Sequence, residues 1–385
     1  MRNWKKVLGV VSATAMAATM MMPASVFAAD DETFKIGVIG PMTGDYAQYG
    51  TNVYNAAKIA ADEINENGGF NGYKVEILDA GDDQGDPEKS VNAYNDLLDK
   101  GMQMLCGTVT SGSCIAVGAE AAESTFLFTP SATALDCITA GTNEFRMCFT
   151  DPAQGTKSAQ FISEHKLATK VAVLYDSAAD YNSGVHDAFV EEAGNVGLDV
   201  VADEAYTTDS NTDYSVQLAK IKKSGAELLF LPNYYSDNAL ILQQASEAGL
   251  DIKFFGVDGM DGILTLEGFD TSLAEGVMLL TPFNADATDE KTQSFVNKYK
   301  ELYGDVPNQF AADAYDGMYI IKAAAEKAGL TPDMDASAIC DAMKTAMTEI
   351  TYDGLTGAGM TWEADGEPNK APKAVVIKDG AYASM

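Results

Sequence analysis

Positive charge and histidine are scarce in this sequence. Its 385 residues include 25 Lys and Arg against 57 Asp and Glu, a formal net charge of −32, and only two histidines. Such acidity excludes electrostatic affinity for nucleic acid or for anionic lipid. Neither His165 nor His186 neighbours a recognisable Ser or Cys nucleophile motif, and solvated helix faces are the better interpretation of both. No catalytic residue is predicted.

Cysteine is also sparse and forms no metal-binding motif. The count is odd and the spacing matches no zinc signature; the five are Cys106, Cys114, Cys137, Cys148 and Cys340. We therefore expect no metal ion, and no cofactor is predicted. Cys137 and Cys148 flank a short polar loop and are the first choice for a disulfide. Cys106 lies in an apolar strand, where a buried thiol is expected.

Beyond its N-terminus the chain lacks an apolar run long enough to cross a membrane. Residues 1–28 have the features of a signal peptide: a basic start, a short apolar stretch over residues 7–22, and small residues before a cleavage point after Ala28. Cleavage would leave 385 − 28 = 357 residues and, with three basic residues lost, a charge of −32 − 3 = −35. We expect a soluble exported protein, and this length favours two domains.

A phosphate-binding loop is missing where the layout suggests one. In "FKIGVIGPMTGDYAQYG" a strand runs into a glycine-containing loop and then a helix. No Lys follows Gly44, the glycines do not fit a dinucleotide fingerprint, and Asp45 would repel phosphate. The loop instead offers Tyr46 and Tyr49 at a strand end. Taken alone, these tyrosines are best explained as packing under a surface turn.

What the chain does contain is a regular alternation of strands and helices. The helix after the first loop places Val53, Ala56, Ala60 and Ile64 on one face, with the helical period. Apolar runs then recur between helical segments, as in "MQMLCGTV", "TFLFTP", "KVAVLY", "AELLFLPN" and "GVMLLTPF". This pattern is typical of parallel sheets covered on both faces. A weak internal repeat, from Asp86 and from Thr212, predicts two α/β lobes with a cleft between them.

Polar groups follow the predicted strands, at the edge where ligands bind open α/β sheets. The first lobe offers hydroxyls and helix-start N–H groups suited to a carboxylate, at Thr110, Ser111, Ser113, Ser131 and Thr133. The second offers aromatic rings and one acid, at Tyr181, Tyr234, Tyr235 and Asp258. Singly, these residues are explained as helix caps, packing and turns. Together they match the polarity of an α-amino acid.

At this point the sequence resembles a known family, the extracytoplasmic solute-binding proteins of ABC transporters for branched-chain and related amino acids. Segments that resemble it, in order and spacing, are "IGVIGPMTGDYAQYG", "AADEINENGGFNGYKVEILDAGDDQGDP", "FLFTPSATAL", "LQQASEAGLDIKFFGVDG" and "ADAYDGMYIIKAAAEKAG". They cover nearly the whole mature chain. The resemblance implies two Rossmann-like lobes with parallel central sheets and a three-segment hinge, the type 1 periplasmic binding fold.

The resemblance also implies lobe boundaries. The N-terminal lobe would comprise residues 33–151 and 282–361, and the C-terminal lobe residues 152–281 and 362–385. Crossovers near Asp151, Thr281 and Thr361 would form the hinge.

The resemblance implies roles for seven site residues. Ser111 would bind the ligand carboxylate, and Ser131 and Thr133 the carboxylate and amino group. Asp258 would pair with the ammonium. Aromatic walls would come from Tyr49, Tyr181 and Tyr234. The match at Phe310 and Tyr315 is looser.

The function that the resemblance implies is delivery of a free amino acid, most simply a leucine-like one, to a membrane permease. The protein would be a periplasmic monomer, without a nucleic-acid partner. Two departures from the family bear on this. Some members form a disulfide near the cleft from a loop position that holds Gly85 here, so that bridge is not expected. No lipobox cysteine is present, which favours a periplasmic location. Alternatives are a receptor for short-chain amides or urea, a sensory binding protein without a transport role, and an exported enzyme.

Overall fold

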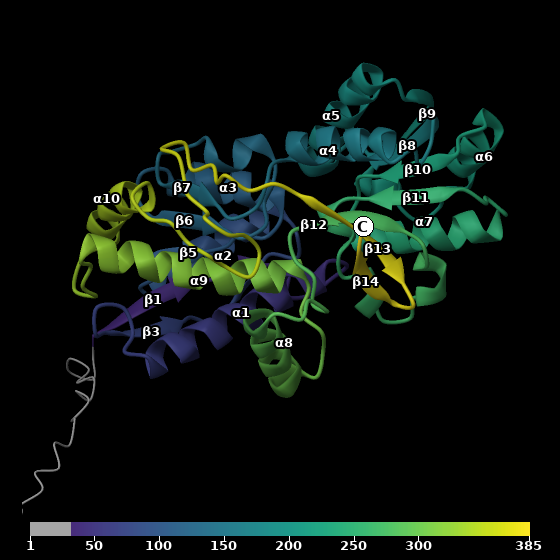
Figure 1. The fold of residues 1–385 in the computed structure, drawn as a ribbon. Helices are drawn as coiled ribbons and strands as arrows, with labels where there is room; N and C mark the ends of the chain where they lie inside the picture. The colour runs from purple at the N-terminus through teal and green to yellow at the C-terminus, as the bar shows by residue number, and fades with distance from the viewer. Residues whose placement is uncertain (1–31) are drawn as a thin grey trace, which may run out of the picture.

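The computed structural model of the chain describes residues 32–385 as two α/β lobes, each built on its own sheet (Figure 1). The first lobe has a five-stranded sheet in the order β3-β1-β5-β6-β7, and the second a seven-stranded sheet in the order β14-β13-β12-β11-β10-β8-β9. The signal peptide predicted for residues 1–28 lies outside the described residues. Within residues 32–385, no helix has the length and apolar character needed to cross a membrane.

The first lobe is made of two stretches of the chain. The first stretch contains β1 (Thr33–Gly37), β2 (Ile39–Gly40), α1 (Ala47–Glu66), β3 (Lys74–Ile77), β4 (Gly81–Asp82), α2 (Pro87–Asp99), β5 (Met104–Cys106), α3 (Ser111–Ala121), β6 (Phe126–Thr129), the 3-10 helix η1 (Leu135–Ile138) and β7 (Glu144–Arg146). The second contains α8 (Glu290–Tyr303), α9 (Gln309–Ala328) and α10 (Ala336–Met347).

The second lobe is likewise made of two stretches. The first contains α4 (Asp151–Glu164), β8 (Lys170–Asp176), α5 (Asp180–Val196), β9 (Asp199–Tyr206), η2 (Thr208–Ser210), α6 (Ser215–Ser224), β10 (Leu228–Leu231), α7 (Tyr235–Glu247), β11 (Lys253–Gly256), η3 (Asp258–Met260), η4 (Ile263–Thr265), η5 (Thr271–Ala274) and β12 (Met278–Thr281). The second contains β13 (Lys373–Lys378) and β14 (Ala381–Ser384). The chain therefore passes between the two sheets three times.

The predicted parallel sheets are confirmed, with one addition. Every pairing in the first sheet is parallel, as are those that join β9, β8, β10, β11 and β12 in the second. The last two strands, β13 and β14, add an antiparallel hairpin at the edge. Asp379 and Gly380 have φ of 53° and 76°, the left-handed conformations that a two-residue hairpin turn requires.

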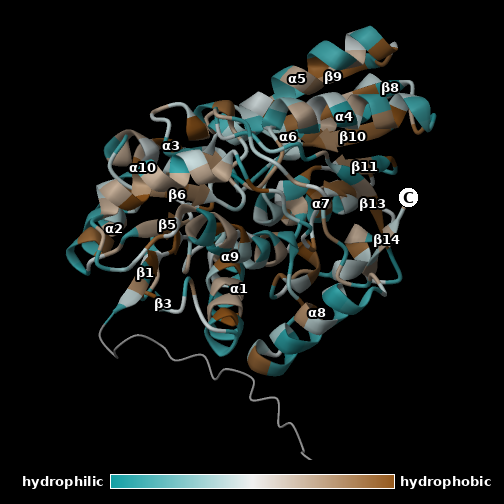
Figure 2. Ribbon diagram, turned by 60° about the vertical axis from the view of Figure 1, so that its left-hand side comes forward, coloured by the Kyte–Doolittle hydropathy of each residue, from teal (hydrophilic) through white to brown (hydrophobic). Residues whose placement is uncertain are grey.

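Burial follows the hydrophobic pattern that predicted these elements. All four residues of β10 are buried, as expected for a strand covered by helices on both faces. In α1 the face that contains Val53, Ala56, Ala60 and Ile64 is buried, and this helix packs against α9. Gly69, with φ of 72°, accepts the left-handed conformation that follows the helix end. Figure 2 shows hydrophobic residues gathered in the central strands of both lobes, under helices with hydrophilic outer faces.

Candidate functional site

One cavity between the lobes brings together all seven residues singled out from the sequence. It lies at the carboxyl ends of the strands and has a volume of about 20 Å³. The predicted residues in its lining are Tyr49, Ser111, Ser131, Thr133, Tyr181, Tyr234 and Asp258. Val109, Thr110, Gly259 and Phe310 complete it. Phe310 belongs to the loosely matched part of the sequence, whereas its companion there, Tyr315, lies elsewhere and donates to Glu63 at 2.5 Å.

The first lobe contributes hydroxyls and backbone groups, and the positions of the Ser111 and Ser131 hydroxyls are fixed by their own hydrogen bonds. Ser111 is the first residue of α3, and its Oγ accepts the N–H groups of Thr133 at 3.3 Å and Ala134 at 3.2 Å. Ser131 donates its hydroxyl to the Val109 carbonyl at 2.8 Å. The first N–H groups of α3 have no partner within the helix and carry its positive dipole end. This half of the cavity suits a carboxylate.

The second lobe contributes a buried carboxyl group, that of Asp258, which has no ion-pair partner among the described residues. Asp258 is 2 % exposed, and its Oδ1 accepts the Tyr181 hydroxyl at 2.6 Å. The same tyrosine oxygen accepts the Gly259 N–H at 2.9 Å, which fixes the ring against the loop. Burial raises the pKa of Asp258 to about 7, although hydrogen bonds from Tyr181 and Gln154 oppose the rise. An ammonium group placed here would favour the ionised carboxylate.

Aromatic rings form the walls between these two polar ends. Tyr181 and Tyr234 are stacked, with centroids 4.9 Å apart and planes 3° from parallel. Tyr49, from α1 in the first lobe, packs edge to face on Phe310 at 4.7 Å and on Tyr235 at 4.8 Å. An amphipathic ring can contact an apolar ligand side chain while its hydroxyl bonds elsewhere.

Tyr49 also joins the two lobes directly. Its hydroxyl donates to the carbonyl of Gly259 and accepts the N–H of Tyr235 at 3.2 Å. From the same side of the cleft, the Tyr46 hydroxyl reaches Asp237 at 3.4 Å. The lobes are thus in contact across the cavity, and the conformation is closed.

The sequence interpretation missed one acid near the cavity. Asp151, considered only as a crossover point, is 1 % exposed, and neither carboxylate oxygen has a hydrogen-bond partner of ordinary geometry within the described chain. Burial raises its pKa well above the usual range, and the nearby Asp258 adds to the rise. Its position at the start of α4, after the N-cap Thr150, reads as an ordinary helix start. Only the fold brings it close to Asp258.

The predicted disulfide between Cys137 and Cys148 is wrong for this structure. All five cysteines are free and buried. Cys137 lies in η1 and directs its thiol to the carbonyl of Ser111 at 3.7 Å, whereas Cys148 contacts the carbonyl of Ala132 at 3.2 Å. The neighbour of Cys137 is instead Cys114, whose thiol lies 3.5 Å from the Cys137 carbonyl. A loop that is short in sequence therefore did not bring its two cysteines face to face. Residues 32–385 contain no group of three or more His, Cys, Asp or Glu arranged to hold a metal ion.

Two α/β lobes close over a cavity, and one lobe offers hydrogen-bond donors suited to a carboxylate while the other offers a buried acid. These features define a two-lobed solute-binding protein. More particularly, the chain belongs to the periplasmic binding protein family, which it matches over residues 33–381.

Curated relatives are similar over most of their length. The Leu/Ile/Val-binding protein BraC3 of Rhizobium johnstonii is 32% identical over 84% of this chain and 88% of its own. The leucine-, isoleucine-, valine-, threonine- and alanine-binding protein of Pseudomonas aeruginosa is 30% identical over 84% of this chain and 85% of its own.

Solved structures show the same fold. The substrate-binding protein LivJ of Streptococcus pneumoniae, in complex with isoleucine, has a TM-score of 0.82 and 27% identity, with 91% of this chain and 98% of that chain covered. The leucine-binding protein LivK of Thermotoga maritima has a TM-score of 0.80 and 25% identity, with 91% and 97% covered. The type 1 periplasmic binding fold inferred from the sequence is confirmed.

Proposed function

We propose that this protein binds a neutral α-amino acid, leucine-like in its side chain, and delivers it to the permease of an ABC importer. The observation that carries this proposal is the polarity of the cavity. Hydroxyls and the start of α3 lie on one lobe, and the buried Asp258 lies on the other. A ligand with a carboxylate and an ammonium on the same carbon satisfies both ends at once.

The walls of the cavity support a small apolar side chain. The cavity itself is narrow in this closed conformation, with a volume of about 20 Å³, which favours a small ligand over a large one. Four aromatic residues line it together with Val109: Tyr49, Tyr181, Tyr234 and Phe310. The relatives named for leucine, isoleucine and valine agree with this inference.

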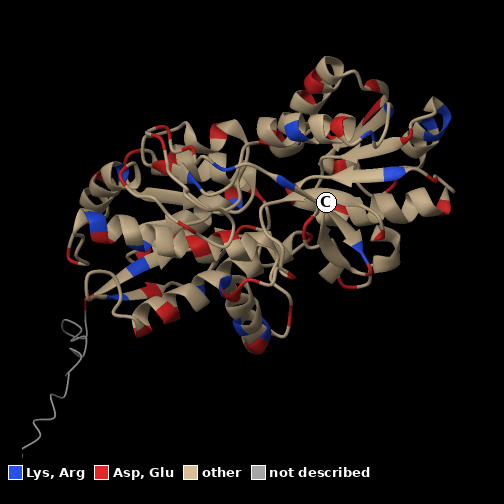
Figure 3. Ribbon diagram, in the orientation of Figure 1, with Lys and Arg blue, Asp and Glu red and all other residues tan. Residues whose placement is uncertain are grey.

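The mouth of the cleft favours a neutral rather than an acidic ligand. Next to the cavity lies a wider opening that shares Thr110, Tyr181 and Tyr234 with it. The opening is lined by one lysine, Lys89, and by five acids: Asp45, Asp86, Asp176, Asp180 and Asp237. Figure 3 shows acidic residues distributed along the ribbon of both lobes. An approaching glutamate or aspartate would be repelled, whereas a zwitterion carries no net charge.

Lobe closure is the proposed mechanism. The N-terminal lobe comprises residues 33–151 and 282–361, the C-terminal lobe residues 152–281 and 362–385, and the hinge lies near Asp151, Thr281 and Thr361. The ligand first binds the hydroxyl side, and closure then brings Asp258 and Tyr181 onto it. The closed form docks on the permease. The protein acts outside the cytoplasm as a monomer and returns its ligand chemically unchanged.

A receptor for short-chain amides or urea is the principal alternative. Such ligands lack an ammonium group and would leave the buried Asp258 without a cation. The test is a thermal-shift screen of the mature chain against all twenty amino acids, urea and acetamide, followed by calorimetry on the hits. Leucine, isoleucine or valine should raise the melting temperature most, because a ligand that binds only the native state stabilises it. Stabilisation by an amide but by no amino acid would overturn the proposal.

A further inference from the structure

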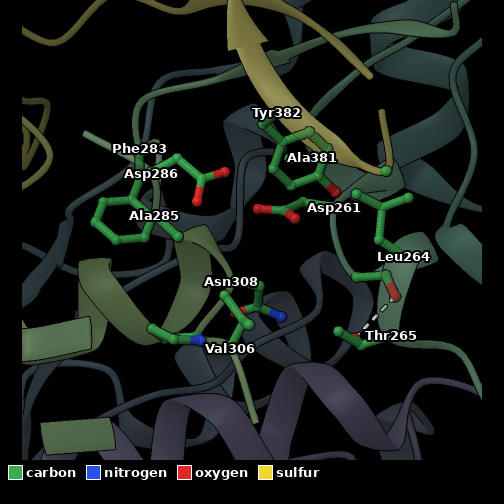
Figure 4. A pocket seen from close by; sticks show the side chains of 13 residues that line it. Asp261, Leu264, Thr265, Phe283, Ala285, Asp286, Val306, Asn308, Ala381 and Tyr382 are labelled. Atoms are coloured by element: carbon green, nitrogen blue, oxygen red, sulfur yellow. Dashed lines mark hydrogen bonds between the residues drawn. The ribbon is translucent and has the colours of Figure 1, made fainter. Parts of the chain in front are cut away.

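A second pocket lies on the other side of the loop that carries Asp258. We call it the rear pocket. Its walls come from the loop Asp261–Thr265, the segment Phe283–Asp286 that follows β12, the segment Val306–Asn308 that precedes α9, and Gly380–Tyr382. Figure 4 shows these side chains around one space, with Asp261 and Tyr382 on one side of it and Val306 and Asn308 on the other. It shares no residue with the amino-acid cavity.

The rear pocket contains a buried donor that no other described residue uses. Asn308 is 7 % exposed, and its Oδ1 caps α9 by accepting the Ala311 N–H at 3.1 Å. This cap fixes the orientation of the amide, because the opposite orientation would place Nδ2 against an N–H group. The Nδ2 group has no hydrogen-bond partner among residues 32–385. An unpaired buried donor is costly, so this nitrogen calls for an acceptor in the pocket.

The opposite wall offers oxygen atoms that can accept a hydrogen bond, from Asp261 and Tyr382. Asp261 is 3 % exposed, and its Oδ2 accepts the Gln309 N–H at 2.8 Å. The Tyr382 hydroxyl is buried beside it, without a hydrogen-bond partner of ordinary geometry in the described part of the chain. Burial raises the pKa of Asp261. The remaining surface is largely apolar, from Leu264, Phe283, Ala285 and Val306.

We propose that the rear pocket is a second binding site, for a small neutral molecule with an amide head and an apolar tail. The amide oxygen accepts from Asn308 Nδ2, and the amide N–H donates to the Asp261 carboxylate or the Tyr382 oxygen. The tail lies against Leu264 and Phe283. A free carboxylate would meet the acid Asp261, and an ammonium would leave the Asn308 donor without an acceptor, so neither class matches both walls.

The rear pocket is connected to the amino-acid cavity through one residue. Gln309 donates its backbone N–H to Asp261 and its Nε2 to the carbonyl of Asp258 at 2.9 Å. Asp258 and Asp261 lie on the second lobe, while Gln309 and Asn308 lie on the first. A ligand in the rear pocket therefore bridges both lobes in their closed arrangement. The rear-pocket ligand should therefore raise the affinity of the protein for the amino acid. By linkage, the amino acid should raise the affinity for the rear-pocket ligand by the same factor.

The experiment uses isobutyramide as the probe and the mature chain saturated with leucine. Because leucine then fills the front cavity, saturable binding of isobutyramide, followed by ligand-observed NMR, reports on another site. Asn308→Asp keeps the capping oxygen and removes the donor, so the affinity for isobutyramide should fall about five- to tenfold. Val306→Phe, at a side chain 40 % exposed at the rim, should fill the pocket and abolish binding. The matched control is Leu302→Phe on α8, 50 % exposed and outside the pocket, which should bind like the wild type.

Three results would overturn the proposal. Absence of saturable binding to the leucine-saturated protein would mean that water alone occupies the pocket. Displacement of leucine by isobutyramide would place the probe in the front cavity. Binding that is unchanged in both Asn308→Asp and Val306→Phe would place it elsewhere on the surface. The coupling between the two sites rests on the proposed function, which leucine calorimetry without isobutyramide tests separately. If leucine does not bind, isobutyramide binding to Asn308→Asp and Val306→Phe without leucine still tests whether the rear pocket is a binding site.

Discussion

The two lobes bring different kinds of chemistry to the ligand cavity. On the first lobe, the Ser111 hydroxyl already accepts two N–H groups and the Ser131 hydroxyl already donates to a carbonyl. On the second lobe, Asp258 is buried and accepts hydrogen bonds, and burial raises its pKa to about 7. The Ser111 and Ser131 hydroxyls are thus held by bonds within the first lobe, although the buried Thr110 hydroxyl beside them has no hydrogen-bond partner among residues 32–385. Asp258, in contrast, has hydrogen bonds but no ion-pair partner in that part of the chain. A ligand should therefore depend more on the second lobe for affinity and on the first for orientation.

The largest expected effect comes from removing the acid. Asp258→Ala leaves the ligand ammonium buried and unpaired, which should cost about 3–5 kcal/mol of binding free energy, or roughly two to three and a half decades of affinity. Calorimetry with leucine measures it. The matched control is Asp180→Ala, which removes an exposed acid at the mouth of the same cleft and should have little effect. Equal losses in the two variants would show that general charge, rather than contact, attracts the ligand.

Substitutions on the hydroxyl side should have smaller effects that do not add. Ser111→Ala and Thr133→Val each remove one hydrogen bond to a charged group, at about 1.5–3 kcal/mol. The two residues also contact each other, since Ser111 Oγ accepts the Thr133 N–H at 3.3 Å. The double variant should therefore lose less than the sum of the single losses. Strict additivity in calorimetry would indicate that they act on separate ligand groups.

The pH dependence of binding should isolate Asp258 from the other buried acids. The amino acid pairs with the ionised carboxylate, so affinity should fall by up to about tenfold per pH unit below the pKa of about 7. Asp258→Asn should remove this slope. The folding stability of the ligand-free protein should change with pH in the opposite direction, falling as pH rises. A carboxyl whose folded pKa is raised contributes stability that is fully present below its unfolded pKa and is lost as pH rises through about 7.

Melting temperatures without ligand, compared between wild type and Asp258→Asn from pH 4 to 8, measure that loss. The difference between the two proteins matters, because Asp313, with a pKa raised to about 6 by burial, titrates in the same direction in both. A wild-type curve parallel to that of the variant would contradict a buried, titrating Asp258.

The smallest expected effect concerns the contact between the lobes. Tyr49→Phe keeps the ring packing and removes the hydroxyl that bonds Gly259 and Tyr235. Loss of these bonds should weaken closure and reduce leucine affinity by about 1–2 kcal/mol. Small-angle scattering should show compaction on leucine binding in the wild type and less compaction in the variant at subsaturating leucine. Tyr54→Phe, on the same helix, is the control. Wild-type compaction absent at saturating leucine would refute hinge closure.

Much of this arrangement could be predicted from the sequence because it depends on local patterns. The alternation of apolar runs and helical periods indicated two parallel sheets, and polar residues after each strand necessarily gather at one edge. Hence Ser111, Thr133 and Asp258 could be predicted to lie close together, and they line one cavity. The C-terminal hairpin was missed, although the Asp379-Gly380 turn carries a recognisable signal.

Other features could not be read from the sequence because they depend on distant contacts. Gln309 reaches Asp258 across 51 positions, and no local pattern marks it. Asp151 resembles an ordinary helix start until the fold brings it near Asp258. The proximity of Cys137 to Cys114 rather than Cys148 likewise follows from how η1 packs against α3.

The position of α9 in the chain affects the order in which the two lobes can fold during synthesis. This helix packs against α1, yet it begins at Gln309, after every strand of the second lobe except β13 and β14 has been made. A nascent chain that ends at Thr281 would expose the apolar face of α1 that α9 normally covers. The first lobe, although begun first, must therefore finish folding late. Truncations before Gln309 should yield aggregation-prone chains rather than half-sized proteins.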